Sequence, residues 1–334
     1  MVELNTTDHY YTGESPSLLW EMTISQSLGD GSGAFAQALE QPAAYGRRLG
    51  EFLLHETDLP VSGGEIIEVG GGYGTLMAGL LQVLSPRRIT MIDISSLLLE
   101  RQRETLAPVA AGSEIRFIRE DVFTWLARER PAADLMILNE NLGDFPTLTG
   151  IDKQALTACQ APASAPGEIP PPGELSPAQL AAEAARVIDT YELDIVDLPP
   201  SFNLNYGALR LLELLAASGV SHIFLCEHGS DTMLPWPFSL FPAIQPPGNH
   251  INPRRINLKD HAEYNIRFDH LEQAASRLGF TVRRAHLMEM LRLRFDDEID
   301  YLLRKGKPEN EAQEILLELY EHISEYQIML LTRT

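Results

Sequence analysis

Cysteine is scarce in this chain: Cys159 and Cys226 are the two cysteines among its 334 residues. Two cysteines do not make the disulfide framework of a small secreted domain, and they suit a reducing compartment. The histidines and cysteines together show no spacing typical of a metal site. No apolar run approaches the roughly 20 residues needed to cross a bilayer, and the first residues have no signal-peptide pattern. These absences predict a cytoplasmic protein with no bound metal and no membrane insertion.

Positive charge is also scarce. The chain has 26 Lys and Arg against 47 Asp and Glu, a formal net charge of −21. Proteins that bind nucleic acid neutralise its phosphates with Lys and Arg, so we expect no nucleic-acid partner; the acidic excess favours a cationic one. The length and the 44% hydrophobic content allow one large or two modest domains with a full core. None of these features predicts an oligomeric state.

The strongest local signal is the stretch from Gly64 to Leu81, GEIIEVGGGYGTLMAGLL. Its short apolar run predicts a buried parallel strand. The strand ends in an acid followed by alternating glycines: Glu68, Gly70, Gly72 and Gly74. A helical pattern begins directly afterwards, at Thr75. Strand, glycine turn and helix form the opening unit of nucleotide-binding α/β domains, where glycine lets a ligand lie against bare backbone.

The spacing of these glycines resembles the first motif of class I S-adenosylmethionine-dependent methyltransferases. A dinucleotide fingerprint reads G-x-G-x-x-G, and its third glycine would fall at Thr75. S-adenosylmethionine brings an ammonium and a sulfonium but no phosphate, so a carboxylate at the strand end suits it. The resemblance therefore implies that Glu68, the three alternating glycines and Thr75 bind S-adenosylmethionine as cofactor.

Polar side chains also follow three further predicted strands. The strands over Arg88–Ile94, Glu114–Arg119 and Asp134–Leu138 end next to Asp93, Asp121 and Asn139-Glu140, respectively. Parallel strands present their carboxyl ends at one edge of the sheet, and open α/β sheets bind ligands there.

A nucleoside would use the first two of these acids differently. Asp93 at a strand end can accept from both ribose hydroxyls, whether the nucleoside belongs to S-adenosylmethionine or to NAD. The methyltransferase resemblance places Asp121 against the exocyclic amine of adenine, with Ile94 and Val122 beside it. An NAD-dependent oxidoreductase stays an alternative because Asp93 fits both cofactors.

Two segments resemble a narrower family, the MidA-like methyltransferases, which include the mitochondrial arginine methyltransferase that assists assembly of respiratory complex I. The similar segments are EVGGGYGTLMAGLL at Glu68–Leu81 and LNENLGDFP at Leu138–Pro146, with looser likeness over Gly33–Leu53 and Glu263–Phe280. The resemblance implies a protein acceptor, with arginine favoured. The chain departs from the family pattern at four positions: Ala34, Gln37, Tyr73 and Gly143.

We expect a Rossmann-like class I methyltransferase fold, a mostly parallel seven-stranded sheet flanked by helices. The S-adenosylmethionine-binding domain is expected to cover residues 61–146 and 204–334. It follows an N-terminal helical segment or lid over residues 1–60, with helices expected over Ser15–Leu28 and Gln37–His55. Residues 147–203 are expected to form an insertion with a proline-rich stretch, Ala161–Pro172, and a helix that starts at the capping box of Ser176 and Gln179. Residues 289–324 are expected to form a helical insertion within the core domain, with helices over Arg292–Lys305 and Glu309–Ser324.

The chemistry expected at this edge is in-line methyl transfer, which needs alignment and, for a nitrogen or oxygen acceptor, a proton sink. Glu140 is the candidate base and would hold a guanidinium by two hydrogen bonds. Asn139 is a candidate for orienting the acceptor or the cofactor. His228, after the predicted strand His222–Glu227, is a second candidate base, although it could also be structural. The aromatic, proline-rich loop Met233–His250 could shape the acceptor pocket or pack on the core.

Three functions therefore stay open. The first is methyl transfer to a protein side chain. The second is methyl transfer to a small molecule, which the aromatic loop and the insertions would also serve. The third is a catalytically degenerate S-adenosylmethionine-binding assembly factor, motivated by the departures at Ala34, Gln37 and Gly143.

Overall fold

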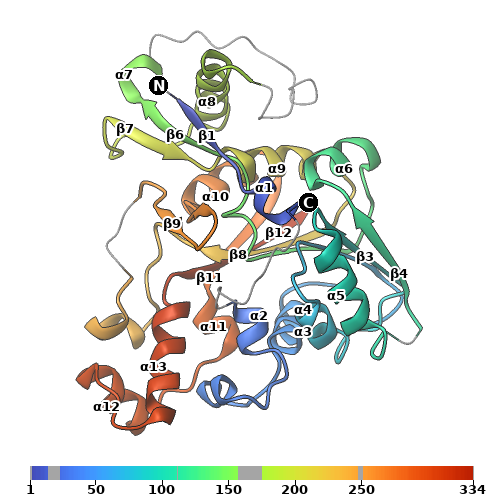
Figure 1. Cartoon of the computed structure of the whole chain (residues 1–334), viewed down its shortest axis with the longest axis vertical. Coiled ribbons are helices and arrows are strands. Elements are labelled where there is room, and N and C mark those ends of the chain that lie inside the picture. Colours follow the sequence, from blue (N-terminus) through green and yellow to red (C-terminus); the bar gives the residue numbers. More distant parts are fainter. Residues whose placement is uncertain (1, 14–22, 111, 157–174, 247–250, 334) are drawn as a thin grey trace.

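The computed structural model describes residues 2–13, 23–110, 112–156, 175–246 and 251–333 (Figure 1). Three of the features predicted above lie wholly or mostly outside these residues: Cys159, the proline-rich stretch 161–172 and the expected helix Ser15–Leu28, of which only α2 (Ile24–Ser27) is described. Among the described helices, none is both long and apolar enough to cross a membrane.

A seven-stranded sheet forms the centre of the protein. Across the sheet its strands are β11 (Phe280–His286), β12 (Tyr326–Arg333), β8 (His222–His228), β5 (Leu135–Asn139), β2 (Glu65–Val69), β3 (Arg88–Asp93) and β4 (Glu114–Arg119). β12 runs antiparallel to both of its neighbours, and every other neighbouring pair is parallel. The predicted Rossmann-like α/β fold with a mostly parallel seven-stranded sheet is confirmed.

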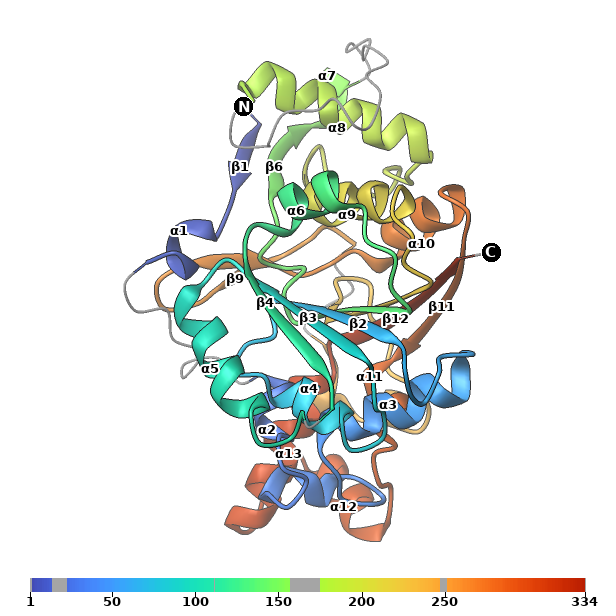
Figure 2. The same cartoon turned by 90° about the vertical axis from the view of Figure 1, so that its right-hand side faces the viewer.

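Helices cover both faces of this sheet (Figure 2). One face packs against α3 (Tyr45–Glu56), α4 (Thr75–Leu80) and α5 (Ser96–Leu106), and the other against α6 (Val122–Glu129), α9 (Tyr206–Ala216) and α10 (Phe268–Arg277). Successive strand residues point to opposite faces, so Ile66 belongs to one buried cluster and Ile67 to the other. Burial on both faces explains why the central strands read as continuous apolar runs.

A smaller three-stranded antiparallel sheet lies beyond α6, α9 and α10, at the top of both views (Figures 1 and 2). It consists of β1 (Glu3–Asn5), β6 (Thr147–Asp152) and β7 (Ser201–Leu204), with α7 (Lys153–Leu156) and α8 (Pro177–Tyr191) beside it. We had expected only proline-rich and helical structure over residues 147–203, so these strands are new. β1 and β7 have three and four residues, too few for a period-two pattern to be recognised.

Helix starts follow local chemistry where a capping residue or proline is present. The predicted capping box of α8 is confirmed, since Ser176 and Gln179 bond reciprocally. The expected helix over residues 37–55 begins only at Tyr45, because Pro42 disfavours helical backbone before it. α12 (Asp297–Lys305) begins after Asp296, whose side chain accepts from the Ile299 amide, although we expected a start at Arg292.

Two helical elements extend the molecule at the end opposite the small sheet (Figure 1). They are α12 and α13 (Glu311–Ile323), and α11 (Leu287–Leu291) leads toward them from β11. The remaining described elements are α1 (Asp8–Tyr11), the hairpin of β9 (Arg255–Asn257) with β10 (Ala262–Tyr264), and three short 3-10 helices over Ala34–Ala38, Phe238–Leu240 and Pro242–Ile244.

The contact between α3 and α4 depends on Gly46, and a substitution there tests it. A Cβ at Gly46 would lie 1.9 Å from the Leu76 carbonyl oxygen, a backbone atom that cannot rotate away. We expect Gly46→Ala to lower the free energy of unfolding by about 1–3 kcal/mol, as overpacked cores do. Urea denaturation followed by circular dichroism measures it.

The control for this prediction is Gly33→Ala. A Cβ at Gly33 would meet its nearest atom, Oδ1 of Asp30, at an ordinary 3.7 Å. Equal unfolding free energies for the Gly46→Ala and Gly33→Ala variants would show that α3 and α4 do not need this close approach.

Candidate functional site

A cavity of about 900 Å³ opens at the carboxyl ends of β2, β3, β4 and β5. Most of the sequence-predicted site residues line it: Glu68, Gly70, Gly72, Asp93, Ile94, Asp121, Val122, Asn139 and Glu140. Three predicted residues do not line it, namely Gly74, Thr75 and His228. The sheet edge therefore brings together the polar ends of four strands, as parallel topology requires.

The turn after β2 needs glycine because its backbone adopts left-handed conformations. Gly70, Gly72 and Gly74 have φ values of 60°, 52° and 82°, in the left-handed region that other residues avoid. Gly74 turns away from the cavity and packs on α5, where a Cβ would lie 3.1 Å from the Gln102 Cα. The alternating glycines thus build the turn, and two of them face the ligand space.

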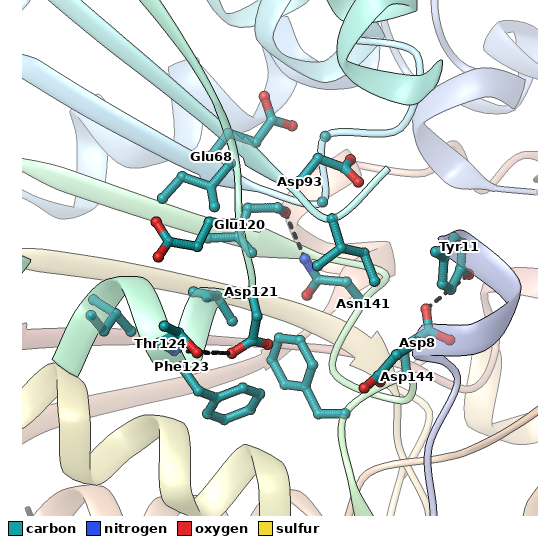
Figure 3. Close-up of a pocket in the computed structure, with 18 of the residues that line it drawn as sticks. Asp8, Tyr11, Glu68, Asp93, Glu120, Asp121, Phe123, Thr124, Asn141 and Asp144 are labelled. Atoms are coloured by element: carbon teal, nitrogen blue, oxygen red, sulfur yellow. Dashed lines mark hydrogen bonds between the residues drawn. The ribbon is translucent and has the colours of Figure 1, made fainter. Parts of the chain in front are cut away.

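Glu68 and Asp93 form a buried pair of carboxylates in the cavity wall (Figure 3). Burial and the nearby Asp93 charge raise the pKa of Glu68 to about 8. Burial also raises the pKa of Asp93 to about 6, although hydrogen bonds from the Ser95 amide (2.9 Å) and Gln102 Nε2 (3.0 Å) oppose the shift. At neutral pH the unliganded pair therefore holds a proton.

The cavity wall contains acceptors that no protein group satisfies. Glu68 Oε2 and Asn141 Oδ1 are buried and have no hydrogen-bond donor among the described residues. Leaving such atoms unpaired is costly, so they mark places where a ligand donates. S-adenosylmethionine carries an ammonium, ribose hydroxyls and an adenine amine, which are all donors. The residues present fit this cofactor.

Asp121 begins α6 and faces the same cavity. Its Oδ1 accepts from the amide (2.9 Å) and hydroxyl (3.1 Å) of Thr124, so Asp121 caps the helix, and no described residue donates a hydrogen bond to its Oδ2. Phe123 packs edge to face on Phe145 at 5.1 Å between ring centroids. Both rings line the cavity and add an apolar wall that the sequence did not reveal.

Glu140 has a different environment from the one expected of a base. Its carboxylate accepts four hydrogen bonds, from the amides of Ile24 (2.8 Å) and Ser25 (3.3 Å), from Asn139 Nδ2 (2.8 Å) and from the Tyr326 hydroxyl (3.1 Å). Two carboxylate oxygens offer about four acceptor positions, so these bonds saturate the group. Burial raises the pKa of Glu140, and the two amides oppose the shift. In this arrangement Glu140 anchors the start of α2, and its role as a base stays a prediction.

Thr75 and Asn139 support the same anchor. The Thr75 hydroxyl donates to the Ser25 carbonyl at 2.8 Å, so it faces α2 and not the cavity. Asn139 Oδ1 accepts from the Tyr45 hydroxyl at 2.5 Å while its Nδ2 donates to Glu140. Ser25 itself lines the cavity. The first turn of α2 is thereby fixed as part of the cavity wall.

His228 lies outside the cavity, next to it on the β8 side. Its Nδ1 is 3.2 Å from Glu227 Oε1, and its ring lies 4.0 Å from that of Tyr326. The described residues of the aromatic loop, 233–246, do not line the cavity either. Phe238 and Phe241 are buried against Phe295, which corresponds to the core-packing alternative.

Several polar cavity residues were missed in the sequence analysis, among them Asp8, Tyr11, Asn141 and Asp144. Asn141 and Asp144 lie in the segment LNENLGDFP, where Asn139 and Glu140 had been preferred. Asp8 and Tyr11 come from α1, a four-residue helix with no apolar periodicity to signal it. In the described part of the chain, no group of His, Cys, Asp and Glu is arranged to hold a metal ion.

The glycine turn and most of the cavity wall lie in a segment that matches a known family model. Residues 51–151 match the family described as putative S-adenosyl-L-methionine-dependent methyltransferase. No curated protein matches the chain in sequence. The match and the strand order of the sheet indicate an S-adenosylmethionine-dependent methyltransferase, with S-adenosylmethionine as its cofactor.

Several solved structures are similar to the chain at low identity. They include the pyocyanin biosynthetic protein (16% identity, TM-score 0.41, 85% of this chain and 54% of that chain). Magnesium protoporphyrin IX methyltransferase from Synechocystis, with bound S-adenosylhomocysteine, is similar at 14% identity and TM-score 0.40, over 86% and 84% of the two chains. An S-adenosylmethionine-dependent methyltransferase from Mesorhizobium loti is similar at 14% identity and TM-score 0.43, over 85% of this chain and 98% of that chain. These TM-scores lie below 0.5, so the fold assignment depends on the sheet itself.

The pair of Glu68 and Asp93 predicts a pH-dependent stability. Between the unfolded pKa of 4.5 and the folded value of about 8, folded Glu68 keeps a proton that the unfolded chain releases. The free energy of unfolding of the unliganded protein should therefore fall as pH rises through this window. We expect Glu68→Gln to flatten this dependence between pH 6 and 8, measured by urea denaturation across the pH range. The exposed Glu318→Gln is the control, and an unchanged slope in Glu68→Gln would contradict the raised pKa.

Glu140→Gln tests the anchoring of α2. The glutamine amide would direct a donor at the Ile24 amide or at the Tyr326 hydroxyl, both of which are donors themselves. We expect a loss of about 2 kcal/mol in unfolding free energy and faster hydrogen exchange at the amides of residues 24 and 25. If turnover falls while stability and exchange match those of Glu318→Gln, the carboxylate acts in the chemistry instead.

Proposed function

We propose that this protein transfers a methyl group from S-adenosylmethionine to a nitrogen of a protein side chain, with arginine as the favoured acceptor. The assignment of the cofactor rests on one observation in the cavity wall. Glu68 Oε2, next to Asp93, is a buried oxygen with no hydrogen-bond donor among the described residues. The preference for a protein acceptor comes from the resemblance of residues 68–81 and 138–146 to the MidA-like family. The acidic excess of the chain supports a cationic acceptor.

Each part of the cofactor has a counterpart in the wall. Asp121 Oδ2 and the side chains of Ile94 and Val122 would hold adenine, and Asp93 would accept from the ribose hydroxyls. Glu68 and the backbone of the glycine turn would hold the methionine end, whose ammonium would compensate the buried carboxylates. S-adenosylmethionine supplies a methyl group on a sulfonium, which the acceptor nitrogen takes by in-line displacement as it loses a proton.

The chain's own contribution would be alignment. The segments that lead into α1 and α2, and those helices, contribute Thr7, Tyr11, Thr23 and Ser25 to the cavity wall. Glu140 and Thr75 hold this N-terminal wall against the sheet edge. A fixed wall lets cofactor and acceptor meet in one orientation, which is the main requirement of a displacement reaction.

Two other functions each have an observation in their favour. A small-molecule acceptor is favoured by the apolar wall of Phe123 and Phe145, which would suit an aromatic ligand. A catalytically degenerate assembly factor is favoured by the saturated carboxylate of Glu140 and by the position of His228 outside the cavity. Transfer of methyl label from S-adenosylmethionine to purified proteins or to small amines separates these alternatives. Cofactor binding without any transfer favours the assembly factor.

Calorimetric titration with S-adenosylmethionine, S-adenosylhomocysteine and NAD tests the proposal first. We expect the first two to bind and NAD not to bind. Asp93→Asn should weaken the binding of S-adenosylmethionine and of S-adenosylhomocysteine by about tenfold, because a hydrogen bond to a charged group contributes roughly that factor in affinity. The exposed Asp297→Asn serves as the matched control. Binding of NAD alone would contradict the proposed function.

A further inference from the structure

The cavity continues from the sheet edge into a groove between α6 and α9, which lie side by side (Figures 1 and 2). The residues of α9 that line the cavity have the spacing i, i+3, i+4, i+7 of one helix face: Arg210, Glu213, Leu214 and Ala217. On α6 the two residues that do not line it, Trp125 and Glu129, are four apart and share the opposite face. We call the space between the cavity-lining faces of α6 and α9 the helix groove.

Contacts at both ends fix α6 and α9 relative to one another. At the start of α9 the Gly207 amide donates to the Pro146 carbonyl at 2.6 Å. Phe145, the residue before Pro146, packs its ring on α6. Beyond the other end the Gly219 amide donates to the carbonyl of Pro131, which follows α6, at 2.7 Å. The helix groove is therefore preformed, as ligand sites usually are.

The middle of the helix groove is apolar and opens to solvent. Leu126 and Ala127 line it from α6, and Leu214 and Ala217 line it from α9. Both alanines are exposed, and both lie near the C-terminal ends of their helices. Their small side chains leave the groove open there, so a ligand can enter from this side.

Arg130 stands at the open end with a free positive charge. It is exposed, lines the cavity, and its side chain has no hydrogen-bond or ion-pair partner among the described residues. The other charges of the groove are paired, Arg128 with Glu120 and Arg210 with Glu213. An exposed arginine alone indicates no ligand, but this one ends an apolar groove. Apolar lining and a terminal cation together favour an apolar ligand with an anionic end.

We propose that the helix groove binds an elongated apolar molecule whose anionic end group pairs with the Arg130 guanidinium. Phe123 and Arg130 mark the two ends of the α6 side of the groove. At roughly 1.5 Å per residue they lie about 10 Å apart along the helix, which is the length of a medium-chain carboxylate. The guanidinium fork matches a carboxylate in two-point fashion.

The width of the groove favours a single chain over a partner helix. A helix with its side chains is about 10–12 Å across, whereas α6 and α9 approach one another to within 8 Å between Cα atoms. An extended hydrocarbon chain is thin enough to lie between two helices at this distance.

This ligand is distinct from the methyl acceptor. Asp121, the residue expected at adenine, lies between Glu68 and Phe123 in the cavity (Figure 3). The helix groove is thus on the far side of the expected adenine from the methionine end. A molecule in the groove would be a second ligand beside the cofactor, so the proposal goes beyond the proposed function.

The test titrates the full chain, saturated with S-adenosylhomocysteine, with decanoate, decanol and butyrate in a calorimeter. Decanol has the same chain without the charge, and butyrate has the same charge on a much shorter chain. We expect decanoate to bind, and decanol to bind about tenfold more weakly because it lacks the charged hydrogen bond. Butyrate should bind at least about a hundredfold more weakly, because it buries far fewer methylene groups.

A first variant, Arg130→Gly, assigns the anionic end. Arg130 has a left-handed backbone with φ of 44°, which glycine adopts without strain, so the substitution removes the guanidinium and keeps the fold. We expect the affinity for decanoate to fall about tenfold. Arg292→Gly is the matched control, because Arg292 is an exposed arginine with φ of 54° at the end of α11, outside the cavity.

A second variant, Ala217→Trp, fills the open end of the groove. We expect the affinity for decanoate to fall at least about tenfold, while that for S-adenosylhomocysteine stays within about twofold of the original. Ala107→Trp is the control, since Ala107 is exposed at the end of α5 and does not line the cavity.

The results separate this proposal from the proposed function. Decanoate that binds no better than decanol, or that keeps its affinity in either Arg130→Gly or Ala217→Trp, overturns the assignment of the helix groove. Decanoate that S-adenosylhomocysteine displaces also overturns it, because the fatty acid would then occupy the cofactor end. These outcomes leave the proposed function standing. Failure of S-adenosylhomocysteine to bind overturns the proposed function, and the same titrations of the unliganded chain then test the groove by themselves.

Discussion

The carboxylate of Glu140 joins parts of the chain that are distant in sequence. It accepts from the amides of Ile24 and Ser25 across 116 and 115 residues, and from the Tyr326 hydroxyl across 186 residues. The end of β5, the start of α2 and β12 are thus held at one point of the sheet edge. The Thr75 hydroxyl, which donates to the Ser25 carbonyl, adds a second bond to α2, so the N-terminal wall of the cavity is held from two sides. Glu140, which the sequence analysis gave as the candidate base, therefore has a structural role in the site.

A second constraint is the pair of buried carboxylates, Glu68 and Asp93, in the cavity wall. Burial raises the pKa of both groups, and the Asp93 charge adds to the shift at Glu68. Asn141 Oδ1 is a further buried acceptor with no donor among the described residues. A ligand with positive charge and N–H donors, such as the ammonium of S-adenosylmethionine, would compensate these groups.

The sequence predicted the sheet edge well because the signals there are local. Apolar runs, the glycine turn and the acids at strand ends are each contained in a few residues, and parallel topology then brings them together. The choice between Asn139 and Asn141 could not be made this way. Both amides line the cavity, but Asn139 is hydrogen-bonded on both sides, whereas Asn141 Oδ1 has no donor among the described residues. The bond from Tyr45 to Asn139 spans 94 residues, so no local pattern reveals it. Gly74 and Thr75 were likewise assigned to the cofactor, although the turn directs them toward α5 and α2.

By itself the sequence determined the fold class, the strand that leads into the glycine turn, and the positions of Glu68, Asp93 and Asp121 at the cavity. These features depend on periodicity and on the conformational freedom of glycine, which are properties of short segments. Only the tertiary structure decided that α1 and α2 contribute to the cavity wall, and that Asn141 and Asp144 line it. The bond between Tyr11 and Asp144 spans 133 residues. Contacts over such separations arise from the packed chain as a whole, so no local pattern contains them.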